Sequence, residues 1–268
     1  MNPSQNLAAE YSRKADAYAR HWAPVIRPMA LPLLAALPLR DARYVVDVGS
    51  GTGSLLPDLA AAAAPGAVII GMDHSEGMLR EGRRTSPHPV AVIDVQHLAI
   101  RSDVVDVALL AFVLFHMPDP ARILAGLFRV LRKGGTLGIV TWGQDPGMPG
   151  ASIWTDELDR EGAAPDPRDQ SVMRQGFLDT QEKLLTLLNA AGYLRLRLWS
   201  ATFCHRWRLD DLLALQTGCG IPARRLADLT ADARARCEAR VRARLKALTP
   251  SDFTYQPEVL FAVAQRPV

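Results

Sequence analysis

The residues of this sequence best suited to chemistry are one carboxylate and three glycines at alternate positions, Asp47, Gly49, Gly51 and Gly53. The apolar run before them predicts a buried parallel strand, and the alanine-rich stretch after them predicts a helix. Glycines let the backbone approach a ligand, and a helix N-terminus offers it unpaired N–H groups. A dinucleotide site would need glycine where Ser54 stands. Asp47 suits an ammonium group better than a pyrophosphate; the alternative is a glycine turn that binds nothing.

Two more carboxylates follow predicted strands. The apolar runs 67–72 and 90–93 close on Asp73 and Asp94. An acid about 20 residues beyond a glycine turn is where such folds hold the two ribose hydroxyls of a nucleoside, and His74 beside it could pack on the adenine. Because ligands sit at the carboxyl ends of parallel strands, we expect the three acids to surround one ligand.

The sequence resembles the class I S-adenosylmethionine-dependent methyltransferases over roughly residues 44 to 142. The resemblance is carried by the glycine turn of 47–53, by Asp-His-Ser-Glu-Gly-Met-Leu at 73–79 and by Leu-Arg-Lys-Gly-Gly-Thr-Leu at 131–137. Ala99, Ile100 and Val105 depart from the family pattern, with apolar replacements. The pattern looks most like the ubiquinone-type and natural-product members, which act on small molecules.

The resemblance implies S-adenosylmethionine as cofactor and S-adenosylhomocysteine as product. It implies that Asp94 accepts a hydrogen bond from the adenine amine, that the backbone N–H of Val95 meets a ring nitrogen, and that Phe112 lies at the methyl end. The expected cofactor-binding residues are Asp47, Gly49, Gly51, Gly53, Asp73, His74, Met78, Asp94, Val95 and Phe112.

His116 is the candidate catalytic residue. It follows the predicted central strand of 107–115 and is expected beside the methyl group, where a histidine can act as base near neutral pH. The alternative is a histidine that only hydrogen-bonds its loop or shapes the pocket. Methyl transfer is an in-line displacement, so no covalent residue is needed.

Candidate substrate-binding residues come from segments expected around the methyl end. Tyr11 and Tyr18 recur at helical spacing in residues 4 to 37, which predict two helices separated around Pro24. Trp142 ends the predicted fifth strand, 136–142. Each of these could instead be a packing residue. Weaker candidates are Met148, Trp154, Arg174 and His205.

Composition narrows the class of protein. The 268 residues carry a net charge of +3, so the chain as a whole has no electrostatic footprint for nucleic acid. Its three cysteines, Cys204, Cys219 and Cys237, have no metal-ligand spacing, and no metal is expected. No apolar run approaches about 18 residues, so we expect no membrane span and a cytoplasmic protein, monomeric or homodimeric.

We expect an α/β fold, a Rossmann-like doubly wound sheet of seven strands with the last antiparallel. The expected organisation is an N-terminal helical lid at 1–40, a cofactor-binding core at 41–143, a substrate loop at 144–178, and a C-terminal part of the core at 179–268 with a helical insertion at 209–248.

We therefore expect methyl transfer to the oxygen, nitrogen or carbon of a small organic molecule in specialised metabolism, such as antibiotic biosynthesis. The sequence Ala-Phe-Val-Leu at 111–114 lacks the Asn/Asp-Pro-Pro-aromatic motif of nucleic-acid amino-methylating enzymes, and no cysteine has the setting of a cytosine nucleophile. The alternatives are an RNA or protein methyltransferase using the arginine-rich insertion, and a regulator that binds the cofactor without chemistry. Ser54 and Asp94 argue against a nicotinamide-dependent oxidoreductase.

Overall fold

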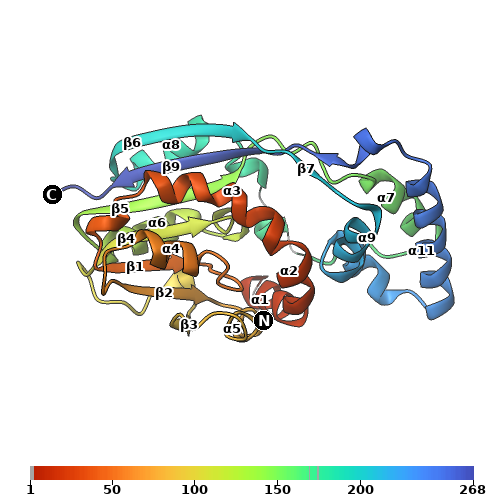
Figure 1. Cartoon of the computed structure of the whole chain (residues 1–268), viewed down its shortest axis with the longest axis horizontal. Coiled ribbons are helices and arrows are strands. Elements are labelled where there is room, and N and C mark those ends of the chain that lie inside the picture. Colours follow the sequence, from red (N-terminus) through yellow and green to blue (C-terminus); the bar gives the residue numbers. More distant parts are fainter. Residues whose placement is uncertain (1–2, 169, 174) are drawn as a thin grey trace.

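The centre of the molecule is a seven-stranded sheet with the strand order β3-β2-β1-β4-β5-β9-β6 (Figure 1). The computed structural model describes residues 3–168, 170–173 and 175–268. Neighbouring strands are parallel from β3 to β5, and β9 runs antiparallel to both β5 and β6. The predicted doubly wound sheet with an antiparallel last strand is confirmed. Its strands are β1 Tyr44–Val48, β2 Val68–Asp73, β3 Val90–Val92, β4 Val105–Ala111, β5 Leu131–Trp142, β6 Leu194–Thr202 and β9 Glu258–Gln265.

Helices cover both faces of the sheet because its central strands are apolar on both sides. Successive residues of β1 point to opposite faces, so Val45 packs in one buried cluster and Val46 and Val48 in another. The first cluster includes residues of α3 and α4, and the second includes residues of α6 and α8. These helices are α3 Ala23–Ala36, α4 Leu56–Ala62, α6 Pro120–Val130 and α8 Gln181–Ala190.

The N-terminal segment forms three helices where the sequence predicted two. α1 (Pro3–Arg13) and α2 (Ala15–His21) are separated at Lys14, which leaves helical geometry with ψ at 10°. The predicted break near Pro24 lies one or two residues earlier, at Trp22, before α3 begins. Both α1 and α2 pack against α5 (Glu76–Gly82), so they lie across the carboxyl edge of the sheet (Figure 1).

Two predicted strand boundaries were wrong. β4 ends at Ala111, not at residue 115, because Phe112 has a positive φ of 55° and Leu114–His116 form a turn of 3-10 helix. β5 begins at Leu131, not at residue 136, because the chain leaves α6 at Val130 and Leu131 pairs with Val105 across a register shift. The first difference matters for function, since it turns His116 out of the sheet.

A second group of helices forms a cap beyond the carboxyl edge of the sheet (Figure 1). Trp154, Leu213, Cys237 and Val241 belong to its own buried core. Two short antiparallel strands, β7 and β8, lie on the connections between the sheet and the cap. The cap helices are α7 Ala151–Arg160, α9 Leu209–Gly218, α10 Ile221–Arg225 and α11 Ala231–Lys246, and the short strands are β7 His205–Arg206 and β8 Thr254–Tyr255.

The arginines of α11 pair with carboxylates of neighbouring cap helices. Arg240 binds Glu157 and Glu161 at 2.5 Å each, and Arg244 binds Glu157 at 2.9 Å. Arg236 and Arg242 bind Glu161 and Asp210, at 2.7 and 2.8 Å. This basic stripe is therefore used to dock α11 on α7 and α9.

The three cysteines are free thiols, of which Cys204 is exposed and Cys237 is buried. Within the described ranges, no three His, Cys, Asp or Glu side chains are grouped so that they could hold a metal ion. In the same part of the chain, no helix has both the length and the apolar character needed to cross a membrane.

Candidate functional site

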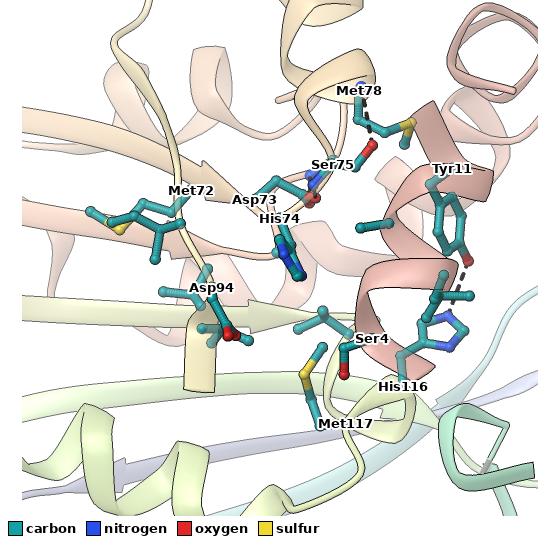
Figure 2. Close-up of a pocket in the computed structure, with 18 of the residues that line it drawn as sticks. Ser4, Tyr11, Met72, Asp73, His74, Ser75, Met78, Asp94, His116 and Met117 are labelled. Atoms are coloured by element: carbon teal, nitrogen blue, oxygen red, sulfur yellow. Dashed lines mark hydrogen bonds between the residues drawn. The ribbon is translucent and has the colours of Figure 1, made fainter. Parts of the chain in front are cut away.

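A cleft opens at the carboxyl ends of the parallel strands, between the sheet edge and α1 (Figure 2). We call it the sheet-edge cleft; its empty volume is about 840 Å³. Residues from β1, β2 and β4 and from the segment that follows β3 form one side, and Ser4, Leu7 and Tyr11 of α1 form the other. The predicted site residues that line it are Tyr11, Tyr18, Gly49, Gly51, Asp73, His74, Met78, Asp94, Val95, Phe112 and His116.

The glycine turn brings the backbone itself close to the cleft, while its amides are used within the protein: those of Gly49 and Ser50 donate to the Met72 carbonyl and that of Gly51 to Asp73. Gly49 has a φ of +76° and Gly51 of +56°, a region that L residues rarely adopt. A Cβ on Gly49 would lie 2.3 Å from Val113 Cγ2, so only glycine fits there. Gly53, also at positive φ, lines neither the cleft nor the neighbouring cavities, and serves the turn without facing a ligand.

Asp47 lies behind the glycine turn and is only 1% exposed. It lines a small cavity that shares Gly49, Gly51 and Phe112 with the sheet-edge cleft. Its Oδ1 is buried and has no hydrogen-bond partner in the described part of the chain. Burial, with a contribution from the charge of Asp73, raises the pKa of Asp47 to about 7. A buried acceptor in this state suits a cationic donor such as an ammonium group.

Asp73 sits between the glycine turn and the start of α5. Its Oδ2 accepts from the Gly51 amide at 2.8 Å and its Oδ1 from the Ser75 amide at 2.7 Å (Figure 2). Burial raises the pKa of this carboxyl, although the two amides act against it. A carboxylate oxygen can accept more than one hydrogen bond, so Asp73 keeps acceptor capacity for a diol.

Asp94 stands at the opposite end of the cleft, just beyond β3. Its Oδ1 accepts from the Gln96 amide and its Oδ2 contacts His97 Nδ1, both at 2.9 Å. Burial opposes ionisation, but the hydrogen bonds from His97 and Gln96 lower the pKa of Asp94. Val95, which follows it, is buried against the cleft. Asp94 is thus a charged acceptor beside an apolar surface, as an adenine would require.

His116 is held at both ring nitrogens. Nδ1 lies 2.9 Å from the carbonyl oxygen of Val172, and Nε2 lies 3.1 Å from the Tyr11 hydroxyl (Figure 2). A carbonyl can only accept, so Nδ1 carries the proton and Nε2 accepts from Tyr11. Burial lowers the pKa of His116 to about 4, with the Val172 hydrogen bond acting against it. The ring is therefore neutral at physiological pH.

A second cavity, which we call the cap cavity, lies between the sheet edge and α7, α9 and α10. It shares Tyr11, Tyr18 and His116 with the sheet-edge cleft. Its empty volume is about 1320 Å³, and its lining is rich in aromatic and apolar groups. Those groups include Trp22, Phe115, Trp142, Met148, Trp154 and Tyr255.

The Trp142 ring of this lining packs against Phe112 of the sheet-edge cleft and lies near Trp22 of the cap cavity. The Phe112 and Trp142 rings lie 4.4 Å apart, and Trp142 and Trp22 lie 6.1 Å apart. The predicted substrate residue Trp142 therefore lines the cap cavity and not the sheet-edge cleft. Among the weaker candidates, Met148 and Trp154 also line the cap cavity, while His205 packs on Trp207 away from it. Arg174 lies outside the described residues.

Sequence reasoning missed the polar groups that fasten α1 over the cleft. Ser12 Oγ accepts from the Gly77 amide at 3.1 Å and lies 2.8 Å from Ser75 Oγ. Ser4 accepts from Gln96 at 3.2 Å. The spacing of Ser4, Leu7 and Tyr11 at one helical face was a usable signal for this lid. Arg224, which binds Glu10 and lines the cap cavity, had none, because it comes from a five-residue helix over 200 positions away.

Comparisons with known proteins agree with this geometry. A model of the methyltransferase domain matches residues 46–139. An uncharacterised methyltransferase of Mycobacterium tuberculosis is 30% identical over 66% of this chain and 69% of its own length. A demethylmenaquinone methyltransferase of Streptomyces avermitilis is 31% identical over 47% of this chain and 53% of its own.

The fold is likewise shared with solved structures. A Bacillus halodurans protein provisionally named a methyltransferase superposes with a TM-score of 0.55 at 18% identity, over 89% of this chain and 98% of that protein. The chain spans 32% and 53% of the length of the first two curated relatives it matches. Together, the glycine turn, the three acids, the sheet order and these similarities place the chain in the class I S-adenosylmethionine-dependent methyltransferase family.

Proposed function

We propose that this protein transfers a methyl group from S-adenosylmethionine to a small organic molecule bound in the cap cavity. One observation carries the proposal: the sheet-edge cleft and the aromatic cap cavity meet at Tyr11, Tyr18 and His116. A transferase needs its two substrates to meet at one place from which water is excluded, and this junction provides it.

The residues of the sheet-edge cleft fit the cofactor. The partnerless Oδ1 of Asp47 would accept from its ammonium group, and Asp73 would accept from its ribose hydroxyls. Asp94 and the amide of Val95 would bind the adenine edge, and His74 and Met78 would pack beside the nucleoside. Gly49 and Gly51 would admit the chain close to the backbone, and Phe112 would lie toward the methyl end. S-adenosylmethionine supplies a methyl group made electrophilic by a sulfonium.

His116 and Tyr11 would act on the acceptor from the junction. The neutral imidazole of His116 has an acceptor at Nε2, which the Tyr11 hydroxyl satisfies in this structure. An acceptor group that takes the place of Tyr11, or binds its hydroxyl, would be oriented by this pair. Tyr18 and Trp142 would form walls that hold the body of the acceptor.

The alternatives receive less support. An RNA or protein substrate was considered because of the arginines of α11, but these arginines are paired with carboxylates of α7 and α9. The relative from Streptomyces avermitilis acts, by its name, on demethylmenaquinone and not on a nucleic acid or a protein, which favours an organic small-molecule acceptor here. We extend the proposal to specialised metabolism. A regulator without chemistry would bind S-adenosylhomocysteine yet turn over no acceptor.

The test is methyl transfer from labelled S-adenosylmethionine to a panel of small phenols, acids, amines and activated carbons. We expect turnover with at least one class, and a fall of about ten- to a hundredfold in kcat for Tyr11→Phe and His116→Ala. Tyr44→Phe is the matched control, because Tyr44 is exposed at the far end of β1. Full turnover by His116→Ala at every pH would remove His116 from the reaction. Cofactor binding without turnover across the panel would favour the regulator.

A further inference from the structure

The charged side chains that line the cap cavity are unevenly balanced. Arg168, Arg224 and Arg225 face it, against one carboxylate, Asp145. The carboxylates that pair with these arginines, such as Glu10, are absent from its lining. The cavity therefore presents guanidinium groups within an otherwise mostly aromatic and apolar wall.

The three arginines differ in how far their N–H groups are already used. Arg225 donates through Nε to the Ala164 carbonyl, and through Nη2 to Asp159 and the Ala163 carbonyl. Arg168 donates through Nε and Nη2 to both carboxylate oxygens of Asp166. Both groups are therefore held by the protein itself.

Arg224 is different. Its Nε donates to Glu10, and neither Nη1 nor Nη2 has a hydrogen-bond acceptor among the residues that the structure describes. The side chain is only 8% exposed. A guanidinium has five N–H donors, and the two terminal nitrogens of Arg224 are not among the fully buried side-chain atoms of the described residues that lack a partner, so they are reached from the cap cavity. The cap cavity is where an acceptor for them can come from.

Arg224 also lies close to the proposed reaction centre. Its partner Glu10 directly precedes Tyr11 on α1. The positive charges of Arg224 and Arg168 lower the pKa of both Tyr11 and His116. For Tyr11 they oppose the larger effect of burial, which raises its pKa. For His116 they add to the effect of burial, which lowers its pKa. Glu10 and Asp73 act in the opposite direction on Tyr11, but each has a smaller effect than either arginine, so the two guanidinium groups are the larger charges acting on this hydroxyl.

The chemistry at the junction points the same way. With its pKa near 4, His116 is a weak base for an alcohol or an ammonium group. An acceptor that is ionised before transfer needs no base. Its oxygen lone pair forms the new bond to the methyl carbon while the carbon–sulfur pair returns to sulfur, so sulfonium and oxyanion are both neutralised and no proton is released.

From these observations, and resting on the proposed function, we infer that the acceptor is a small organic acid with a flat apolar body, whose oxyanion is bound by Nη1 and Nη2 of Arg224 beside Tyr11 and His116. The rings of Trp22, Trp142 and Tyr255 would hold its body. Carboxylates and acidic phenols share this chemistry.

The test measures binding by calorimetry, with the protein saturated in S-adenosylhomocysteine. The probes are benzoate, cinnamate and 4-nitrophenolate, compared with benzamide, cinnamamide and benzyl alcohol. We expect at least one acid to bind ten times more tightly than its neutral counterpart. A methyl-transfer assay on the acids that bind then tells carboxylate acceptors from phenolates.

Two variants of the buried pair separate ligand binding from a structural role. Arg224→Gln should weaken acid binding about ten- to a hundredfold and leave the neutral probes unchanged. Glu10→Gln removes the competing carboxylate and should strengthen acid binding severalfold. A purely structural pair would weaken binding in both variants. The double variant Glu10→Gln/Arg224→Gln removes both members of the pair, with Lys14, which also pairs with Glu10 at 3.2 Å, left in place, and should also lose the preference for acids. The control is Arg242→Gln, a half-exposed arginine of the cap.

The inference is overturned if neutral probes bind as tightly as acids, if no acid binds, or if Arg224→Gln weakens acids and amides equally. The proposed function fails on a different result, namely no binding of S-adenosylhomocysteine or no methyl transfer to any class of acceptor. Amine or carbon acceptors that are methylated in preference to acids would keep the function and reject the inference.

Discussion

The hydroxyl of Tyr11 lies 3.1 Å from Nε2 of His116, although 105 positions separate the two residues. Because Nδ1 of the same ring donates to the Val172 carbonyl at 2.9 Å, the histidine is fixed in one tautomer. The lid helix α1, the end of the central strand and the segment around residue 172 thus meet on one imidazole. The contact of α1 with the junction therefore depends on this hydrogen bond.

His116 should stay neutral across the physiological range. Its pKa of about 4 means that protonation begins only near pH 5, so its charge cannot produce a break in kcat/KM between pH 5.5 and 8. Nitrogen NMR of the protein should show a proton on Nδ1 and none on Nε2. His21, which is partly exposed, is the internal comparison. A His116 titration near pH 6.5 would contradict the buried, neutral assignment.

Asp47→Asn should separate stability from binding. The pKa of about 7, raised from 3.8, means that the folded state holds the proton more tightly than the unfolded chain. The protonated Asp47 carboxyl therefore stabilises the folded state fully below pH 4. This stabilisation is lost as the pH rises through 7, above which the buried, ionised carboxylate destabilises the folded protein. At pH 8 the variant should be more stable without ligand, by on the order of 2–4 kcal/mol, in urea unfolding.

The same substitution should weaken S-adenosylhomocysteine, because its ammonium group loses an anionic partner. For the wild type, affinity should fall by up to tenfold per pH unit below 7, since Asp47 must release a proton to bind a cation. The variant should lack this pH dependence. An Asp47→Asn protein with unchanged affinity and pH profile would show that Asp47 does not meet the ammonium group.

Gly51→Ala tests the glycine turn against a matched control. Gly51 and Gly66 have φ of +56° and +81°, so alanine at either position should cost about 1–2 kcal/mol of stability through backbone strain. A Cβ on Gly66 meets nothing within 4 Å, whereas one on Gly51, a cleft-lining residue, would lie 3.3 Å from Met78 Cε. Only Gly51→Ala should weaken S-adenosylhomocysteine, by tenfold or more. Equal affinities in the two variants would argue against a ligand on this turn.

We expect Gly77→Ala to displace α1 from its contact with α5. A Cβ on Gly77 would lie 2.6 Å from the Cα and the carbonyl oxygen of Ser12, so α1 must move away from α5. We expect faster hydrogen exchange over residues 3–13 and weaker cofactor binding. Gly126→Ala in α6 is the control, because its Cβ would meet its nearest neighbour at 3.6 Å. It should gain about 0.5–1 kcal/mol. Unchanged exchange in Gly77→Ala would mean that α1 is not docked through this contact.

The cofactor half of the site could be predicted from the sequence because its signals are local. Glycines at alternate positions and acids at the ends of apolar runs mark where the strands end in the sequence. Parallel strands bring these ends to one edge of the sheet. This is why Asp73, Asp94, Gly49 and Gly51 could be expected to line one cleft, while their binding of the cofactor stays a prediction. The doubly wound fold class could be predicted for a similar reason, since each parallel strand and its following helix leave a short-range pattern in the sequence.

The acceptor half could not be predicted because long-range packing decides it. Arg224 meets Glu10 across 214 positions, and only the folded cap brings them together. The sequence did not show that arginines of α11 are paired, because the carboxylate that binds Arg240 and Arg244 belongs to α7. β4 ends before Phe112, because this residue has a positive φ. The continuous apolar run of 107–115 gave no sign of this strand end. In the two arginine cases a neighbour distant in the sequence decided the outcome.

The most direct test of the central claim is calorimetric titration of the wild-type protein and of Asp73→Ala with S-adenosylmethionine, S-adenosylhomocysteine and NAD. Asp232→Ala, on the exposed side of α11, is the control, and thermal unfolding verifies that each variant is folded. We predict that the wild type and the control bind both sulfur compounds and not NAD, and that a folded Asp73→Ala binds them at least tenfold more weakly. Binding of NAD instead, or unchanged affinity in Asp73→Ala, would contradict the assignment of the sheet-edge cleft to S-adenosylmethionine.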